Sequence, residues 1–271
     1  MTAPVCLACG VQAADGPAPA ACAICADERQ MVGVGGHGGQ RWTTIDALAT
    51  DHRNEVVEEE PGLVGLVTRP RLGIGQRALL VRTPAGNLLW DCLSLVDDAT
   101  VEVLEELGGV AAIALSHPHF YGACLEWSDR LGAAPVYVHA DDAGWVQRPG
   151  DAYRFWDGEE VEPVAGLRLL RLGGHFPGSS AVLWPGGAGG RGALLSSDTV
   201  QVVPDRRFVS VMWSYPNHVP VDARTLDAIA GRLDGLHFDR IYGAFPGNVV
   251  RAGGKDAVTR SFARYARHLQ G

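Results

Sequence analysis

The chain has 271 residues, of which 46% are hydrophobic, and a formal net charge of −8. This length suits one large domain, or one domain with a small appendage, and the acidic charge argues against non-specific binding to nucleic acid or to an anionic membrane. No segment has the length of a transmembrane helix, and residues 1–5 lack the basic and apolar regions of a signal peptide, so we expect a cytoplasmic protein.

Four cysteines near the N-terminus stand in two C-x2-C pairs with twelve residues between them: Cys6, Cys9, Cys22 and Cys25. Two such pairs favour a structural Zn²⁺ held by four thiolates in a closed tetrahedral site. A cytosolic setting disfavours disulfides, and a redox C-x-x-C pair would stand beside a βαβ pattern, which is not found nearby. The glycine-rich run at residues 33–39 predicts a flexible join. We therefore expect a zinc knuckle in residues 1–40 and a second domain in residues 41–271.

In the second domain the apolar runs and their spacing predict alternating strands and helices. The expected strands lie at residues 63–67, 78–81, 87–90, 110–115, 135–139, 167–172, 181–184, 193–195 and 240–242. The expected helices are a short one after the N-cap Thr44 and three more at residues 99–107, 122–131 and 256–269. Such an order implies an α/β sandwich with ligand-bearing loops at one edge.

Two histidines, His117 and His119, directly follow the buried strand at residues 110–115. On an extended or turning backbone alternate side chains point the same way, so both imidazoles can be aimed at one point. A histidine pair alone is also compatible with ordinary polar loop residues. A metal site is favoured because later strands also end in residues that can bind a metal, namely His175 and Asp198.

These strand ends together resemble the metallo-β-lactamase superfamily, whose αββα sandwich carries an HxHxDH motif, a later histidine, a bridging aspartate and a final histidine. The matching segments are Trp90-Asp91, His117-Pro118-His119, Gly174-His175-Phe176-Pro177-Gly178-Ser179 and Ser197-Asp198-Thr199, within residues 60–250. With its cysteine pairs, the chain resembles a divergent branch that carries an N-terminal knuckle. The resemblance implies a four-layer αββα fold with a metal site, in which Asp91 supports a ligand imidazole from behind.

The departures from the family pattern all fall on its second metal position. Tyr121 stands in place of the motif's aspartate, Gly122 in place of its last histidine, and Phe245 where the final histidine is expected. The resemblance therefore implies one metal, held by the three histidines that remain: His117, His119 and His175. Asp198 is either a fourth ligand or a base that holds the water. Tyr121 is either a phenol donor to an oxyanion or an aromatic that fills the vacated position.

The loop after Asp198 should cover this site. Trp213, Tyr215 and Phe245 are candidates for the walls of an apolar substrate pocket. Arg206 or Arg207 either meets a substrate carboxylate or is simply solvated.

The expected function is that of a mononuclear zinc hydrolase, in which zinc-bound hydroxide attacks the ester, thioester or lactone carbonyl of a small molecule. The expected cofactors are one Zn²⁺ in the sandwich and one in the cysteine knuckle, with iron as the alternative metal in the sandwich. Two alternatives belong to other classes: a non-catalytic module that binds a metal, a metabolite or a protein partner, and a mononuclear iron oxidoreductase on the same fold. Substrate, oligomeric state and physiological metal are left open by the sequence.

Overall fold

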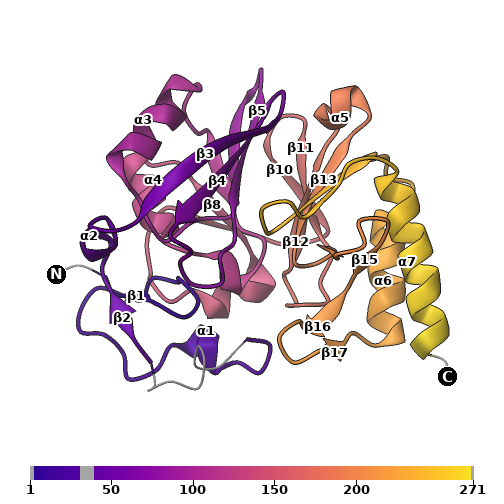
Figure 1. Cartoon of the computed structure of the whole chain (residues 1–271), viewed down its shortest axis with the longest axis horizontal. Helices are drawn as coiled ribbons and strands as arrows, with labels where there is room; N and C mark the ends of the chain where they lie inside the picture. Colours follow the sequence, from indigo (N-terminus) through magenta and orange to yellow (C-terminus); the bar gives the residue numbers. More distant parts are fainter. Residues whose placement is uncertain (1–2, 31–39, 270–271) are drawn as a thin grey trace.

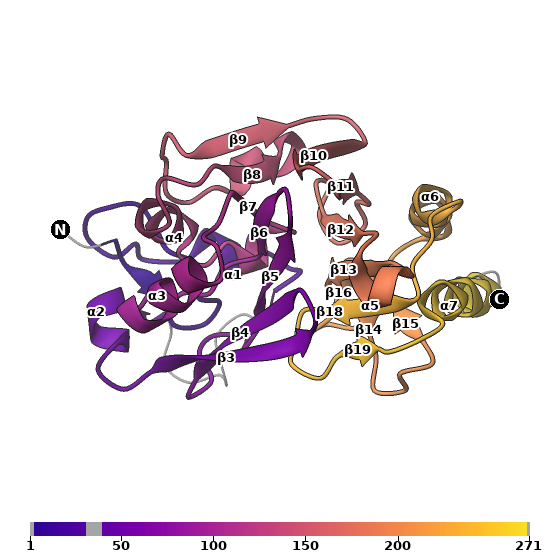
Figure 2. The ribbon, with the colours of Figure 1, turned by 90° about the horizontal axis from the view of Figure 1, so that it is seen from above.

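A computed structural model describes residues 3–30 and 40–269. Two β-sheets face each other, with helices on the outer face of each sheet (Figures 1 and 2). Three hydrophobic clusters fill the three interfaces of these four layers. The αββα sandwich implied by the strand-end motifs is therefore confirmed. The predicted join at residues 33–39 lies outside the described residues.

In the described chain the first sheet has seven strands in sequence order: β3 (Arg53–Glu60), β4 (Leu63–Arg69), β5 (Ala78–Thr83), β6 (Gly86–Trp90), β7 (Ala112–Ala114), β8 (Val136–His139) and β9 (Tyr153–Trp156). β3 to β6 form an antiparallel meander, and β6 to β9 run parallel. The sequence analysis missed β3, because its run of charged residues lacks the apolar alternation that predicts a strand.

The second sheet has six strands among the described residues: β10 (Glu160–Val164), β11 (Leu167–Arg171), β12 (Ser180–Trp184), β13 (Ala193–Ser197), β18 (Arg240–Gly243) and β19 (Val249–Val250). β11 and β12 pair antiparallel, as do β12 and β13, whereas β13 and β18 are parallel. β11, β13 and β18 therefore point the same way, and the segments that follow them emerge at one edge. Two small hairpins lie beyond this edge: β14 (Gln201–Val202) with β15 (Val209–Ser210), and β16 (Met212–Ser214) with β17 (Val219–Pro220).

The helices cover the two outer faces (Figure 2). On the first sheet lie α3 (Asp98–Glu106) and α4 (Cys124–Arg130), and on the second α6 (Ala223–Leu233) and α7 (Gly254–Leu269). The remaining helical turns in the described part of the chain are α1 (Ala23–Ala26), α2 (Ile45–Leu48), α5 (Gly187–Gly190), η2 (Pro118–Phe120) and η3 (Ala140–Trp145). Thr44 caps α2 as predicted, since its side chain accepts the N–H of Ala47 at 3.2 Å. The sequence analysis missed α6, although Asp222 caps it in the same way and its buried residues have helical spacing.

The N-terminal segment is packed onto the sandwich rather than standing apart from it. β1 (Val5–Cys6) pairs with β2 (Trp42–Thr43), so a strand pair joins the two sides of the predicted boundary at residue 40. The four paired cysteines belong to the same hydrophobic cluster as Leu89 and Ile113 of the first sheet. Unfolding of this segment would therefore expose part of the sandwich core.

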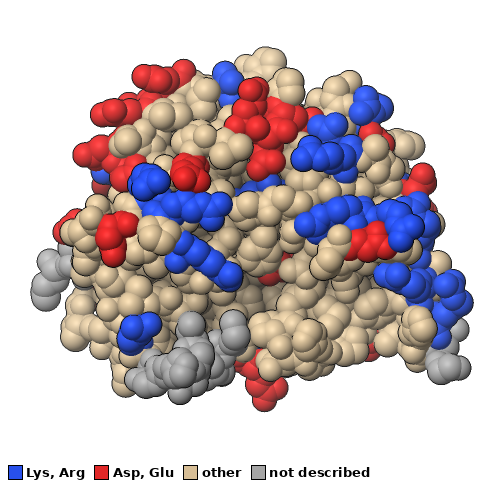
Figure 3. All heavy atoms as spheres, in the orientation of Figure 1, with Lys and Arg blue, Asp and Glu red and all other residues tan. Residues whose placement is uncertain are grey.

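The surface charge is unevenly distributed. On the face shown in Figure 3, acidic side chains gather over α3 and arginines over α7. Among the described residues, no helix combines the length and apolar character that crossing a bilayer requires.

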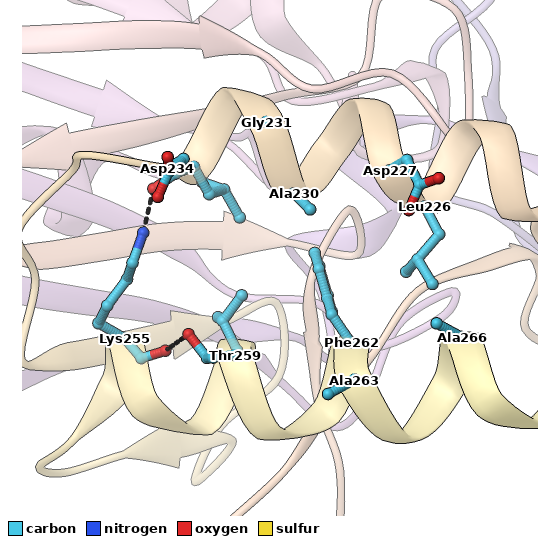
Figure 4. Close-up of a pocket in the computed structure, with 12 residues that line it drawn as sticks. Leu226, Asp227, Ala230, Gly231, Asp234, Lys255, Thr259, Phe262, Ala263 and Ala266 are labelled. Atoms are coloured by element: carbon cyan, nitrogen blue, oxygen red, sulfur yellow. Dashed lines mark hydrogen bonds between the residues drawn. The ribbon is translucent and has the colours of Figure 1, made fainter.

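A cavity of about 470 Å³ lies between α6 and α7 (Figure 4). Leu226, Val258 and Phe262 contribute to its apolar lining, and Lys255 donates a hydrogen bond from Nζ to the carbonyl of Leu233 at one end. None of its lining residues belongs to the histidine cluster described next.

Candidate metal centre

The ends of two strands, one from each sheet, bring the three predicted histidines together. His117 follows β7 of the first sheet, and His119 lies in the 3-10 turn η2 directly after it. His175 follows β11 of the second sheet through two glycines whose φ angles of 71° and 83° turn the chain sharply. All three side chains are buried, and one nitrogen from each lies within 4.8 Å of the others. The ligand set expected for a single metal is thus assembled.

The ring nitrogens are spaced as ligands of one metal ion would be. His119 Nδ1 lies 3.1 Å from His175 Nε2. Two nitrogens bound tetrahedrally to zinc at 2.0–2.1 Å would be separated by about 3.3 Å. His117 Nε2 faces the same space and is buried with no hydrogen-bond partner, a costly arrangement for a polar atom without a ligand. The residues therefore fit a metal ion.

Hydrogen bonds on the far sides of two rings fix their orientation. His175 Nδ1 lies 2.9 Å from the carbonyl oxygen of Trp213, to which it can only donate, so its Nε2 carries the lone pair. His117 Nδ1 lies 2.9 Å from Ser116 Oγ. Burial lowers the pKa of His175 to about 4 and the pKa values of the other two imidazoles well below their usual range. All three rings are therefore neutral at pH 7, the form in which imidazole binds metals.

Asp91 supports the backbone next to His117 rather than a ligand imidazole itself. Its Oδ1 accepts the backbone N–H of Ser116 at 2.8 Å rather than an imidazole N–H. Ser116 Oγ in turn contacts both His117 and, at 2.8 Å, Ser197 Oγ on the second sheet. Neither serine was predicted to take part in the site. Asp91 and Ser197 also have positive φ angles, 61° and 51°, a backbone conformation that the sequence does not indicate.

Asp198 lies at the edge of the cluster. Its Oδ2 is 4.0 Å from His117 Nε2, while Oδ1 accepts a hydrogen bond from Gln201 Nε2 at 3.3 Å. Burial raises the pKa of this carboxyl to about 7. The carboxylate is close enough to hold a water molecule against the three-histidine site, and Gln201 is a further polar group that the sequence analysis missed.

Two positions where the metallo-β-lactamase motif has second-metal ligands are occupied differently in this chain. Gly122 has φ of 51°, and a Cβ there would lie 2.6 Å from the carbonyl oxygen of Cys92, so the backbone leaves no room for a histidine. Tyr121 is 3% exposed and directs its hydroxyl to the carbonyl of Asp142, at 3.3 Å. The hydroxyl of Tyr121 is thus engaged in the core, and of its two predicted roles the packing aromatic agrees with these contacts.

The candidate pocket residues lie at different distances from the histidines. The ring of Tyr215 is 5.7 Å from that of His175, and its hydroxyl donates to the carbonyl of Asp198 at 2.6 Å. Trp213 touches the site through its carbonyl oxygen. Phe245 is further out, with its ring 6.2 Å from that of Phe120, which packs on His117. Tyr215 and Trp213 thus contact His175, whereas the ring of Phe120 lies between Phe245 and His117.

The arginines that the sequence analysis considered are not the ones at the site. Arg207 is exposed and paired with Asp205, and Arg206 donates to a carbonyl of its own loop. Arg29 of the N-terminal segment instead lies beside the histidines, with its guanidinium 4.0 Å from the Phe176 ring centroid. No sequence pattern marks this contact, because it joins residues far apart in the chain.

The four cysteines form a second cluster at the N-terminus. Cys6 Sγ lies 3.6 Å from Cys25 Sγ, and Cys9 Sγ lies 3.7 Å from Cys22 Sγ, while none of the four is in a disulfide. Thiolates bound tetrahedrally to zinc at about 2.3 Å would be about 3.8 Å apart. Gln40 Nε2 donates to Cys6 Sγ at 3.0 Å, an interaction that favours a thiolate. The cluster therefore fits a closed four-thiolate metal site.

Solved metallo-β-lactamases have the same fold. The DIM-1 enzyme superposes with a TM-score of 0.58 at 14% identity, covering 80% of this chain and 98% of that one. The FIM-1 enzyme from Pseudomonas aeruginosa, in its mono-zinc form, gives 0.56 at 14% identity, covering 79% and 96%. No family model matches the chain. Fold and histidine cluster together define a divergent protein of the metallo-β-lactamase fold.

A relative from Bacillus subtilis (strain 168), named Uncharacterized protein YmaE, is 41% identical over 268 residues, which span 98% of this chain and 96% of the relative. The chain belongs to the same family as this protein. The alignment includes almost the whole chain, so the family relationship is not confined to the sandwich.

Proposed function

We propose that the protein is a hydrolase dependent on one metal ion in the sandwich, with zinc as the metal. The observation that carries this proposal is the convergence of three neutral, buried imidazoles on one point, with His117 Nε2 left without a hydrogen-bond partner. When bound by three imidazoles, zinc acts as a Lewis acid and lowers the pKa of a coordinated water to about 7. His117 Nε2, His119 Nδ1 and His175 Nε2 are the atoms that would hold it.

The chain's own groups are placed for hydrolysis of a carbonyl compound. Asp198 can accept a proton from the attacking water and orient it, with Gln201 fixing the carboxylate. The aromatic ring of Tyr215 lies beside His175 and favours a substrate with an apolar portion, while Trp213 contacts His175 through its backbone carbonyl oxygen. We propose the substrate to be an ester, thioester or lactone of a small molecule.

The test combines metal content with hydrolysis. Protein purified without added metal is analysed for zinc and iron per chain and then assayed on panels of chromogenic esters, thioesters and lactones. We expect one zinc beyond that of the cysteine cluster, together with hydrolysis that His117→Ala abolishes. Metal at the histidines without hydrolysis of any panel would favour the non-catalytic alternative, and iron in place of zinc would favour the oxidoreductase.

A further inference from the structure

Arg29 connects the cysteine cluster to the histidine centre. It lies four residues after Cys25, at the end of the segment that leaves α1. Its side chain is only 13% exposed, and its Nε and Nη2 atoms donate to the two carboxylate oxygens of Asp27 at 2.6 and 2.8 Å. This two-point pairing fixes the guanidinium plane, so that Arg29 is held as a rigid arm.

The free edge and the face of the guanidinium contact the surroundings of one ligand, His175. Nη1 donates to the carbonyl oxygen of His175 at 3.4 Å. The guanidinium carbon lies 4.0 Å from the ring centroid of Phe176, the next residue, and 5.6 Å from that of Trp213, whose carbonyl accepts the His175 Nδ1–H. Arg29 therefore contacts both the backbone that carries the ligand and the residue that orients its ring.

The backbone of the same segment is joined to the loop that carries Trp213. Ser214 Oγ donates to the carbonyl of Arg29 at 3.2 Å, and Asn217 Nδ2 donates to the carbonyl of Glu28 at 2.8 Å. In Figure 1 the α1 segment and the β16–β17 hairpin meet at the lower edge of the sandwich, where these hydrogen bonds lie. The cysteine cluster is thus anchored to the side of the site that holds His175.

We propose that Arg29 is a positioning residue for His175, and that metal binding by the four cysteines therefore sets the affinity of the histidine centre for its own metal. This inference rests on the proposed function only in requiring that the histidines bind a metal. The cysteine cluster fixes Cys25, and Cys25 fixes the start of the segment that leads to Arg29. Arg29 in turn holds His175 in the orientation that metal binding with His117 and His119 requires. Groups that orient ligands in this way typically change metal affinity by roughly 10-fold to 100-fold.

The chain contains a matched control for Arg29. Arg207 makes the same hydrogen bonds to Asp205 that Arg29 makes to Asp27, including the backbone N–H bond to Oδ1, but its side chain is 79% exposed. Replacing Arg207 therefore removes an equivalent ion pair that does not touch His175. A difference between Arg29→Ala and Arg207→Ala reports the contacts of Arg29 with the site.

The experiment titrates metal-free full-length protein with Co²⁺. Thiolate ligands give an intense charge-transfer band that imidazole ligands do not, so one titration separates filling of the cysteine cluster from filling of the histidine centre. Competition with a chelator then gives the zinc affinity of each site. We expect Arg29→Ala to keep the charge-transfer band and weaken the histidine centre roughly 10-fold to 100-fold. Arg207→Ala should match the wild type, and Arg29→Lys, which keeps the charge but loses the two-point pairing, should lie between.

A second variant tests the link to the cysteines. Cys25→Ser should lose the charge-transfer band and weaken the histidine centre as well. If Arg29→Ala left the affinity of the histidine centre within twofold of the wild type, or if only Cys25→Ser changed it, Arg29 would not be the connection and the proposal would be overturned. Wild-type protein that filled the cysteine cluster but took no metal at the histidines would instead refute the proposed function, and this inference with it.

Discussion

His119 Nδ1 and His175 Nε2 lie 3.1 Å apart, although the two residues are 56 positions apart in the chain and follow strands of different sheets. Such an approach of two buried, neutral rings is explained either by a shared proton or by a shared metal ion. The unpartnered His117 Nε2 beside them favours the metal, because a shared proton would leave that atom unsatisfied.

Removal of one ligand should empty the histidine centre alone. His117→Ala leaves two imidazoles, too few for a stable zinc site of this type, so metal content should fall from two ions per chain to one. Elemental analysis of purified protein measures this directly. His237→Ala, at an exposed position, is the control and should keep both ions. An unchanged metal content in His117→Ala would place the sandwich metal elsewhere.

Asp198→Asn should separate catalysis from metal binding. The amide keeps the size and the contact with Gln201 but cannot accept a proton from water, so hydrolysis should fall about 100-fold or more. Metal content should stay close to one ion in the sandwich, because the three histidines are unchanged. Turnover and elemental analysis on the same preparation give both quantities. Equal losses of metal and activity would identify Asp198 as a ligand.

The cysteine cluster should contribute to the stability of the whole chain. Cys22→Ser should remove one metal ion and also lower the thermal midpoint of the sandwich, because the four cysteines share a hydrophobic cluster with the first sheet. Cys92→Ala removes a buried thiol that is not one of the four clustered cysteines, and it should keep both ions. Scanning calorimetry with elemental analysis tests this, and an unaltered sandwich transition in Cys22→Ser would show that the N-terminal segment folds independently.

Gly122→Ala should destabilise the protein more than the same change at Gly132. Both glycines have positive φ, 51° and 72°, and this backbone strain costs an L residue about 1–2 kcal/mol. Only at Gly122 would the added Cβ also meet carbonyl oxygens, the nearer at 2.6 Å, so its total cost should be about 2–5 kcal/mol. Urea unfolding of the two variants compares these losses. Equal losses of stability in the two variants would mean that the backbone can accommodate a side chain at position 122.

Asp142 should make stability depend on pH in the acidic range. Burial raises the pKa of this carboxyl to about 6 from an unfolded value of 3.8, while its Oδ1 accepts the N–H of Gly178 at 2.8 Å. Because the folded state binds the proton more tightly, the contribution of Asp142 to stability is present below about pH 4 and is lost as pH rises through about 6.

The matching variant is Asp142→Asn, which keeps the acceptor for Gly178 but does not titrate. Its stability relative to the wild type should increase by about 2–3 kcal/mol between pH 4 and pH 7. Because both proteins contain the other acidic groups, the difference between them isolates Asp142. Urea unfolding at a series of pH values measures it, and a difference that does not vary with pH would contradict the assignment.

The metal-ligating residues that follow strands could be predicted from the amino-acid sequence. Each ligand stands shortly after an apolar run, and the resemblance of these strand ends to the metallo-β-lactamase motifs identified His117, His119 and His175 as one ligand set. The cysteines needed no such resemblance, because two C-x2-C pairs have the spacing that one tetrahedral ion requires. In both cases the pattern lies in residues close together in the chain, and such short spacings can be read directly from the sequence.

The groups that support the ligand residues could be found only from the three-dimensional fold. Ser116 meets Ser197 across the two sheets, Arg29 reaches Phe176 from the N-terminal segment, and Tyr121 turns its hydroxyl into the core. Gly122 was expected only as a missing ligand, whereas its contact with the backbone at Cys92 explains why no side chain fits there. Such contacts join residues with no fixed spacing in the chain, and packing selects them, so no periodicity or motif could predict them.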